Sequence, residues 1–205
     1  MAIHGKVAAF YSHVSGAASH ATLEAMSTIV GSTTLYTIDD SAKKYWDAGG
    51  NVTVYVGGAA TSSDFYAIQW SGGRVVFNSA PGATVTIDCN HYTVAKIGGG
   101  FNWSLNPRNN LAEVPTFGDN WMYRLGGIRD WDVTFERFWT NDGFATVYDR
   151  NNDVHAVLYL DIGSNTVRYE GRGKISTMDI SAPAQEVIDQ SITISGEGTM
   201  YDRLG

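Results

Sequence analysis

The sequence predicts a mainly β protein, and three observations support this prediction. Apolar and polar residues alternate with a period of two over many short segments, for example residues 52–56, as in half-buried strands. Glycine is frequent, with 23 in 205 residues, and is paired at Gly57 and Gly58 and at Gly72 and Gly73, which favours turns. Helical spacing of apolar residues is rare. We therefore expect a β-sandwich or half-barrel with one or two short helices.

The expected strands share this alternation and are rich in β-branched and aromatic residues. In chain order they cover residues 52–56, 75–77, 84–88, 131–136, 154–160, 168–176 and 190–197.

Two segments have helical spacing instead. In residues 19–30, Leu23 and Met26 share one face, and Ser19 can cap the N-terminus. Residues 142–150 also place apolar residues at i, i+3 and i+4, with irregular coil as the alternative. The sequence therefore predicts short helices at 19–30 and 142–150.

Charge is distributed unevenly along the chain. Residues 1–100 hold 5 of the 14 basic and 6 of the 21 acidic side chains, and the remainder lies in residues 101–205. This shift indicates two parts that meet near the glycine run 98–100. We expect an N-terminal β-rich portion at 1–97 and a second portion at 98–205, with a single intertwined domain as the open alternative.

Composition excludes several function classes. The net charge of −7 disfavours a protein that grips nucleic acid, because phosphate binding needs clustered Lys and Arg. No segment has about 18 consecutive apolar residues, and the first residues do not resemble a signal peptide, so we expect no membrane binding. Cys89 is the only cysteine, which excludes an intramolecular disulfide.

No catalytic or metal site is predicted. Asp130, Asp132 and Glu136 lie on one face of a single expected strand, whereas the acid pair of a glycosidase flanks a sugar across a cleft. A solvated strand face is the favoured interpretation. The five histidines lack metal-ligand spacing. We expect no enzyme activity and no cofactor.

Residues 102–120 form an unusual connection. They contain Pro107 and Pro115 and exceed the length of ordinary loops. Their apolar side chains disfavour plain disorder and predict an exposed interaction element. These side chains are Trp103, Leu105, Leu111, Val114 and Phe117.

The second half resembles a known family. The segments TFGDN at 116–120, GIRDWDVTFE at 127–136, YEGRG at 169–173, ISAP at 180–183 and GEG at 196–198 occur in this order. The ordered set resembles the core signature of the major tail proteins, or tail tube proteins, of long-tailed phages, over roughly residues 91–200. Residues 36–40, 43–47, 52–56 and 73–78 resemble an N-terminal portion of related phage structural proteins.

The resemblance implies a subunit that self-assembles. In this family, strands from six subunits close an inner β-barrel, and the hexameric rings stack into a tube that conducts double-stranded DNA in the virion tail. A long loop reaches the next ring, and residues 102–120 match it. Expected partners are other copies, a tape-measure protein, and terminator and baseplate proteins, with DNA as a passenger rather than a ligand. Assembly would occur in the host cytoplasm. Because no sheath is recognisable, the expected tail is non-contractile.

Two strand faces are candidates for the channel wall and the subunit contact. The wall candidates carry carboxylates and a hydroxyl and are Asp130, Asp132, Thr134 and Glu136. The inter-subunit candidates are mixed in sign and are Arg168, Glu170, Arg172 and Lys174.

Two other functions stay open at this point. A carbohydrate-binding β-sandwich could use the 6 tryptophans and 11 tyrosines as sugar platforms, although core and interface packing is the favoured role of these aromatics. Another phage tail structural protein, such as a terminator or a baseplate hub, has the same expected β character.

Overall fold

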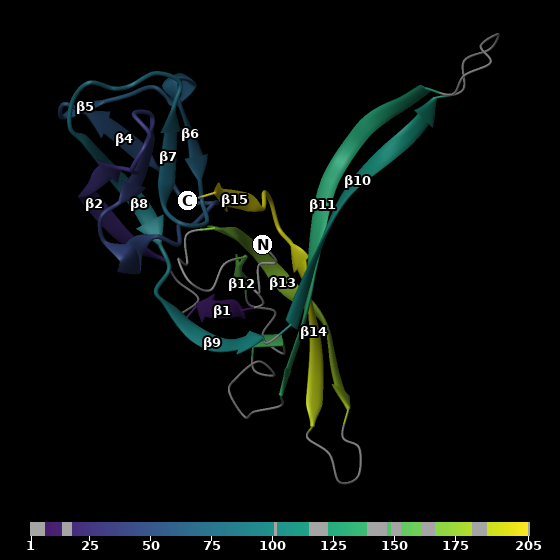
Figure 1. The fold of residues 1–205 in the computed structure, drawn as a ribbon. Coiled ribbons are helices and arrows are strands. Elements are labelled where there is room, and N and C mark those ends of the chain that lie inside the picture. The colour runs from purple at the N-terminus through teal and green to yellow at the C-terminus, as the bar shows by residue number, and fades with distance from the viewer. Residues whose placement is uncertain are drawn as a thin grey trace. The chain divides into compact units, whose positions relative to one another are not determined.

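The computed structural model shows a mainly β chain that divides into two units (Figure 1). Unit 1 consists of Met1–Phe10 and Ile97–Gly205, and unit 2 of Tyr11–Lys96. The structure describes residues 7–13, 18–100, 102–114, 123–138, 147–148, 153–160, 167–181 and 188–204. The mainly β class predicted from the alternation is confirmed.

Unit 1 is built around one sheet of the order β10-β11-β14-β13-β12-β1-β9, with β15 paired to β13 beside this path. The strands are β1 (Val7–His13), β9 (Val94–Gly100), β10 (Asn102–Val114), β11 (Tyr123–Phe138), β12 (Asp153–Tyr159), β13 (Val167–Ser181), β14 (Asp189–Gly196) and β15 (Tyr201–Leu204). β1 belongs to unit 1 as far as Phe10, and β9 belongs to it from Ile97. The pairs β10–β11, β11–β14, β13–β14 and β12–β13 are antiparallel.

Unit 2 contains a seven-stranded sheet of the order β5-β4-β8-β2-β3-β7-β6. Its strands are β2 (Ser19–Thr28), β3 (Leu35–Ile38), β4 (Thr53–Val56), β5 (Ala59–Ala60), β6 (Tyr66–Gln69), β7 (Arg74–Phe77) and β8 (Val85–His91), with short 3-10 turns at Ser41–Lys43 and Ser63–Phe65.

The helix expected at 19–30 is wrong, because β2 occupies most of this segment. The reason is a bulge between Ala21 and Glu24, where β2 has one residue more than β8. The extra residue breaks the two-residue period, so that Ala21 and Met26 are both buried although they are five positions apart. Leu23 adopts a positive φ of 50° within the bulge. Of residues 142–150, only 147 and 148 are described, and both are helical.

The core of unit 1 lies on one face of its sheet. Phe10 and Phe135 stack with ring centroids 3.8 Å apart, and Trp131 Nε1 donates a hydrogen bond to the Gly198 carbonyl at 2.9 Å. A Cβ at position 196 would overlap the Trp131 indole, so only glycine fits there. The aromatic side chains of β11 therefore fix which face of the sheet is buried.

The core of unit 2 surrounds the single cysteine. Cys89 is fully buried among Trp46, Val54 and Ile87. Burial, followed by the nearby carboxylates of Glu24 and Asp88, raises the pKa of the thiol to about 11. Since the thiolate is the reactive form, the thiol is inert in the folded chain.

We expect the native protein at pH 8 to react with a disulfide reagent such as Ellman's reagent only very slowly, because Cys89 is buried and protonated. Full reaction should follow unfolding in guanidinium. The colour released with and without denaturant measures this, and rapid stoichiometric reaction of the folded protein would contradict the described burial.

Candidate assembly surface

The two faces of β11 differ sharply. Trp131, Val133 and Phe135 are buried in the core of unit 1. Because side chains alternate along a strand, the residues between and beside them lie on the opposite face. The structure thus places the four predicted wall residues, Asp130, Asp132, Thr134 and Glu136, together on the face away from the core.

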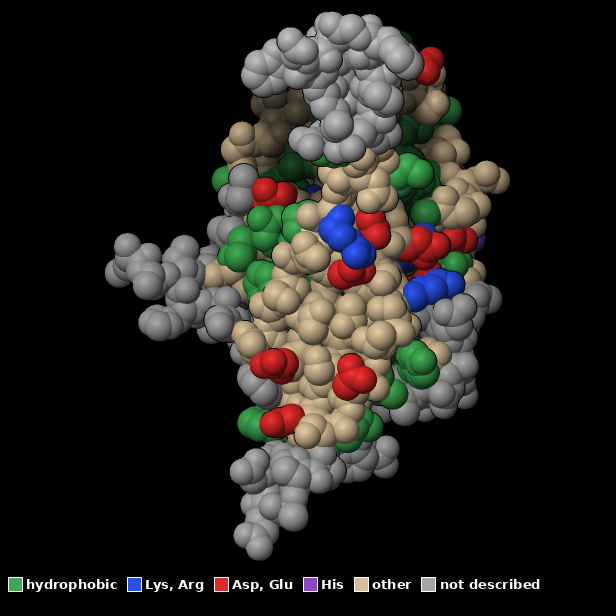
Figure 2. Space-filling model, turned by 90° about the vertical axis from the view of Figure 1, so that its right-hand side faces the viewer, with side chains coloured by type: hydrophobic (Ala, Val, Ile, Leu, Met, Phe, Trp, Pro, Cys, Tyr) green, Lys and Arg blue, Asp and Glu red, His purple; other side chains and the backbone are tan. Residues whose placement is uncertain are grey.

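The strand register extends this polar face over four strands. Each of three cross-strand rows takes one residue from β10, β11, β14 and β13 in turn. We call these rows, together with Arg108 and Asp130, the open face. The rows are Asn102, Glu136, Ser191 and Asp179; Ser104, Thr134, Thr193 and Thr177; and Asn106, Asp132, Ser195 and Lys174. Figure 2 shows a largely uncharged polar surface with separate acidic groups and basic groups that lie beside acidic ones.

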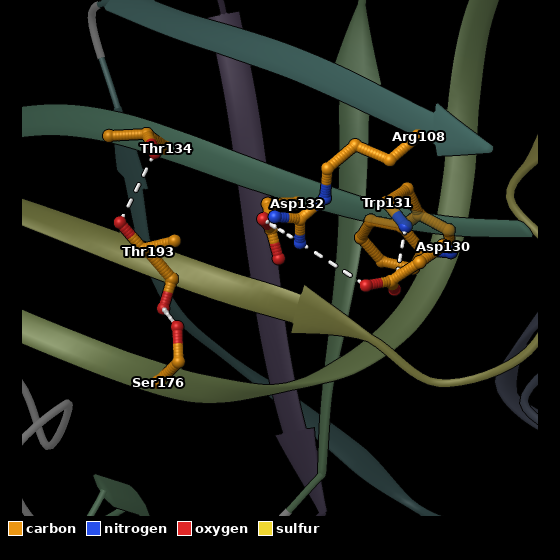
Figure 3. A network of polar contacts seen from close by, with 7 residues as sticks. All are labelled: Arg108, Asp130, Trp131, Asp132, Thr134, Ser176 and Thr193. Carbon is orange, nitrogen blue, oxygen red and sulfur yellow. Dashed lines mark hydrogen bonds and ion pairs between the residues drawn. The ribbon is translucent and has the colours of Figure 1, made fainter. Parts of the chain in front are cut away.

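Hydroxyl and amide side chains on and beside the open face form hydrogen bonds between neighbouring strands. The hydroxyls of Thr134 and Thr193 lie 3.1 Å apart, and the Ser176 hydroxyl donates to the Thr193 carbonyl at 3.2 Å (Figure 3). Asn102 Nδ2 donates to Glu136 Oε2 at 2.8 Å. These bonds link neighbouring strands and leave a polar surface at the solvent.

Arg108 is a positively charged residue at the end of the open face where the β10–β11 hairpin extends beyond β14. Its Nη2 lies 3.2 Å from Asp130 Oδ2 and contacts Asp132 Oδ2 still more closely (Figure 3). Asp130 also accepts the Trp131 backbone N–H at 2.7 Å. The Arg108 side chain is 49% exposed, and exposed ion pairs of this kind add little to stability.

A groove of about 760 Å³ lies beside Arg108. Its lining includes Arg108, Arg129, Asp130, Trp131 and Met200. The groove therefore lies beside the Arg108 guanidinium, which two carboxylates hold.

The second predicted set lies on β13 and is ion-paired within the chain. Arg172 lies 3.8 Å from Asp153 and 3.5 Å from Glu197, and Lys174 lies 3.8 Å from Asp153. An inter-subunit role for Arg168, Glu170, Arg172 and Lys174 stays a prediction.

Glu170 is the buried member of this set. Arg168 Nε and Arg203 Nε donate to its two carboxylate oxygens at 2.7 and 2.9 Å, and the Arg203 side chain is only 3% exposed. Burial by itself raises the pKa of Glu170, but Arg203 and Arg168 outweigh it and hold the pKa below its ordinary value. The carboxylate therefore joins β15 to β13. Sequence reasoning missed Arg203, which has no motif and approaches Glu170 only through strand pairing.

The β10–β11 hairpin continues beyond the rest of the sheet. β14 pairs with β11 only over Asp132–Phe138, so the remaining parts of β10 and β11 pair with each other alone among the described residues. We call residues 108–114 and 123–130 the arm, which Figure 1 shows reaching away from the other strands of unit 1. Ile128 is 81% and Leu111 51% exposed there. An isolated two-stranded ribbon is marginally stable in water, so the arm is suited to a partner.

The loop expected at 102–120 is wrong as far as residue 114, where β10 is a strand. Pro107 is compatible with this because β10 is at the sheet edge, where a residue without an N–H is tolerated. Trp103 and Leu105 pack against the core of unit 1 and are not part of the arm. The Val114 side chain and Phe117 lie outside the described residues.

The described tryptophans contribute to packing. Trp46 and Trp131 are buried, and Trp70 and Trp103 pack against the two cores. Trp121 and Trp139 lie outside the described part of the chain. These positions disfavour a sugar platform built from the four described tryptophans.

Two other kinds of site are absent from the described residues. No group of three or more His, Cys, Asp or Glu residues in this part of the chain is arranged to hold a metal ion. Within the same residues, no helix has the length and apolar character needed to cross a membrane.

No family model matches the sequence, and no curated protein matches it. Chains of solved structures are similar to this one, and two of them come from gene transfer agent particles. One is described as the tail of an empty gene transfer agent particle with C6 symmetry (TM-score 0.44, 13% identity, 54% of this chain and 86% of that chain). The other is a native gene transfer agent virion (0.41, 12%, 53% and 88%). Because both TM-scores are below 0.5, the function proposed below stands on the chain's own residues.

We expect Glu170→Gln to destabilise the protein by about 3–5 kcal/mol, because it removes the buried carboxylate charge that lies against the buried Arg203 guanidinium. Arg172→Gln is the matched control, since its more exposed ion pairs should each contribute about 1 kcal/mol or less. Urea unfolding of the three proteins at neutral pH measures the difference. Equal losses in the two variants would contradict a structural role for the buried triad.

The same triad predicts a pH dependence. Because the folded-state pKa of Glu170 is lowered, its stabilising contribution is present above the ordinary glutamate pKa of about 4.3 and is lost as pH falls through the folded-state pKa. The free energy of unfolding should therefore fall less steeply on acidification in Glu170→Gln than in the parent protein. Parallel curves below pH 4.3 would show that Glu170 is not perturbed.

Proposed function

We propose that the protein is a structural subunit of a phage tail tube, whose copies form rings that stack into a conduit for double-stranded DNA. The observation that carries the proposal is the open face, a polar surface over four neighbouring strands whose other side is the core. The resemblance of residues 116–136 and 169–198 to tail tube proteins adds support. The role is structural, and it places the chain in the virion tail after assembly in the host cytoplasm.

Ring formation would use the edges of the sheet. Among the described strands, β10 has no neighbour on its outer side. β12 pairs with β13 only as far as Lys174, so residues 175–181 of β13 also lack a described neighbour on that side. Unpaired edges favour pairing with another chain. We infer that β10 of one copy continues the sheet onto β13 of the next, and that repetition closes a barrel of six copies, as the resemblance to the tail tube family implies.

The open face would then be the inner wall. Hydroxyl groups and carboxylates predominate on it, and its two basic side chains, Arg108 and Lys174, are paired with acids. Carboxylates repel phosphate, and hydroxyls carry no charge to hold it. Such a wall lets DNA slide without binding it, which reconciles a net charge of −7 with a DNA passenger.

The arm would join one ring to the next. Its exposed Leu111 and Ile128 offer apolar area to a neighbour, and a head-to-tail contact that does not close produces a filament. Tape-measure, terminator and baseplate proteins would then act at the inside and the ends of this filament.

Two alternatives differ in what they predict. A terminator or baseplate hub would form a ring that does not stack, and a carbohydrate-binding module would stay monomeric and bind a glycan. The tube is favoured over the glycan module because the described tryptophans pack in the cores.

We expect negative-stain electron microscopy of the purified protein to show rings and tubes with a central hole, because β10, residues 175–181 of β13 and the arm offer contacts to other copies. Single rings alone would indicate a terminator or hub. Monodisperse monomers at high protein concentration would contradict the proposed function.

Replacing residues 110–128 with Asn-Gly, a tight turn between the paired Asn109 and Arg129, should abolish stacking and leave rings. The replacement spares Trp103 and Leu105, so the melting temperature should stay close to that of the parent protein. Val30→Ser, which alters a fully exposed apolar residue of unit 2, is the control and should form normal tubes. Long tubes from the arm replacement would show that the arm does not stack the rings.

A further inference from the structure

Arg108 is an unexpected residue on the open face. A guanidinium forms bidentate, charge-assisted hydrogen bonds with phosphate, and the Arg108 side chain is about half exposed beside a groove of about 760 Å³. On a wall that lets DNA pass, such a group would hold the passenger. The position therefore requires a reason why Arg108 does not bind phosphate.

The geometry supplies this reason. Asp130 and Asp132 are two positions apart on β11, so both side chains lie on the face where Arg108 of the facing strand lies (Figure 3). Arg108 Nη2 contacts one carboxylate oxygen of each. Asp130 is itself held in place by the Trp131 backbone N–H. The two carboxylates are therefore directed at the guanidinium and occupy donors that a phosphate would use.

We propose that Asp130 and Asp132 shield Arg108, and that removal of their charge converts this part of the wall into a phosphate-binding site. The inference deepens the proposed conduit function and rests on it. Loss of both carboxylate charges leaves the Arg108 guanidinium without these two counter-charges. The shielding pair thus prevents adhesion, and its contribution to stability is small because the contacts are partly exposed.

Retention on double-stranded DNA coupled to agarose tests the proposal in the full-length chain. The parent protein should pass through at low salt. Asp130→Asn/Asp132→Asn should be retained and elute as salt rises, because each new phosphate contact adds about 0.9 to the salt slope of binding. Asparagine keeps the acceptor for the Trp131 N–H, so thermal melting monitored by circular dichroism should stay near that of the parent protein. If the double variant does not fold, Asp130→Asn and Asp132→Asn are tested singly and should each show partial retention.

Two further variants separate shielding from net charge. Glu136→Gln/Asp179→Asn removes the same number of negative charges from the open face, but Glu136 bonds Asn102 and lies away from Arg108, so it should still pass through. Adding Arg108→Gln to Asp130→Asn/Asp132→Asn should abolish the retention.

Passage of the folded Asp130→Asn/Asp132→Asn variant through the column would overturn the proposal. Equal retention of the two charge-matched double variants would also overturn it, because net charge alone would then explain binding. The column measures whether the two aspartates prevent DNA binding by Arg108, whether or not tubes form. Electron microscopy measures whether the protein assembles into tubes. The two experiments therefore test the further inference and the proposed function separately.

Discussion

The two-residue period of β11 is the constraint on which the open face depends. Its odd-numbered residues from Trp131 to Phe135 are buried, and the Trp131 ring occupies the space beside Gly196, where no Cβ fits. A shift of one residue would bury the carboxylates and expose the aromatics. Packing of the core therefore dictates that Asp130, Asp132 and their neighbours lie on the opposite face, whatever that face contacts.

Unequal strand lengths explain the other features of unit 1. β11 extends well past the end of its pairing with β14, which creates the arm, and β13 extends past its pairing with β12, which leaves an edge. Arg108 lies where the sheet narrows to two strands and links β10 to β11 through two carboxylates. The same strand lengths thus produce the open face, an unpaired part of β13, the arm and an arginine held by two carboxylates. In the proposed tube, these features would serve as the inner wall, the ring contact and the stacking contact.

The sequence predicted the features that depend on local pattern. Alternation around Asp132 predicts the polar face of β11, because the two-residue period of a strand can be seen in consecutive residues of the sequence. Other features depend on residues that are distant in the sequence, and no local pattern predicts them. They are the register that aligns Thr134 with Thr193 and the ion pairs of Arg108 and Arg203. The helix expected at 19–30 is wrong because Leu23, at helical spacing from the buried Met26, is an exposed residue of the bulge in β2. The loop expected at 102–114 is wrong because Pro107 and the adjacent Asn109 and Asn110, which are typical of loops, occur here in an edge strand.

The most direct test of the account is the accessibility of the open face after assembly. Ser104→Cys adds a reactive thiol to an exposed position of that face, while Cys89 is buried. In assembled protein, a small maleimide should label Cys at position 104 and a large polymer-linked maleimide should not, because only the small reagent enters a channel. Both reagents should label the unassembled subunit. Labelling of the assembled protein by both reagents would place the face outside and contradict the account.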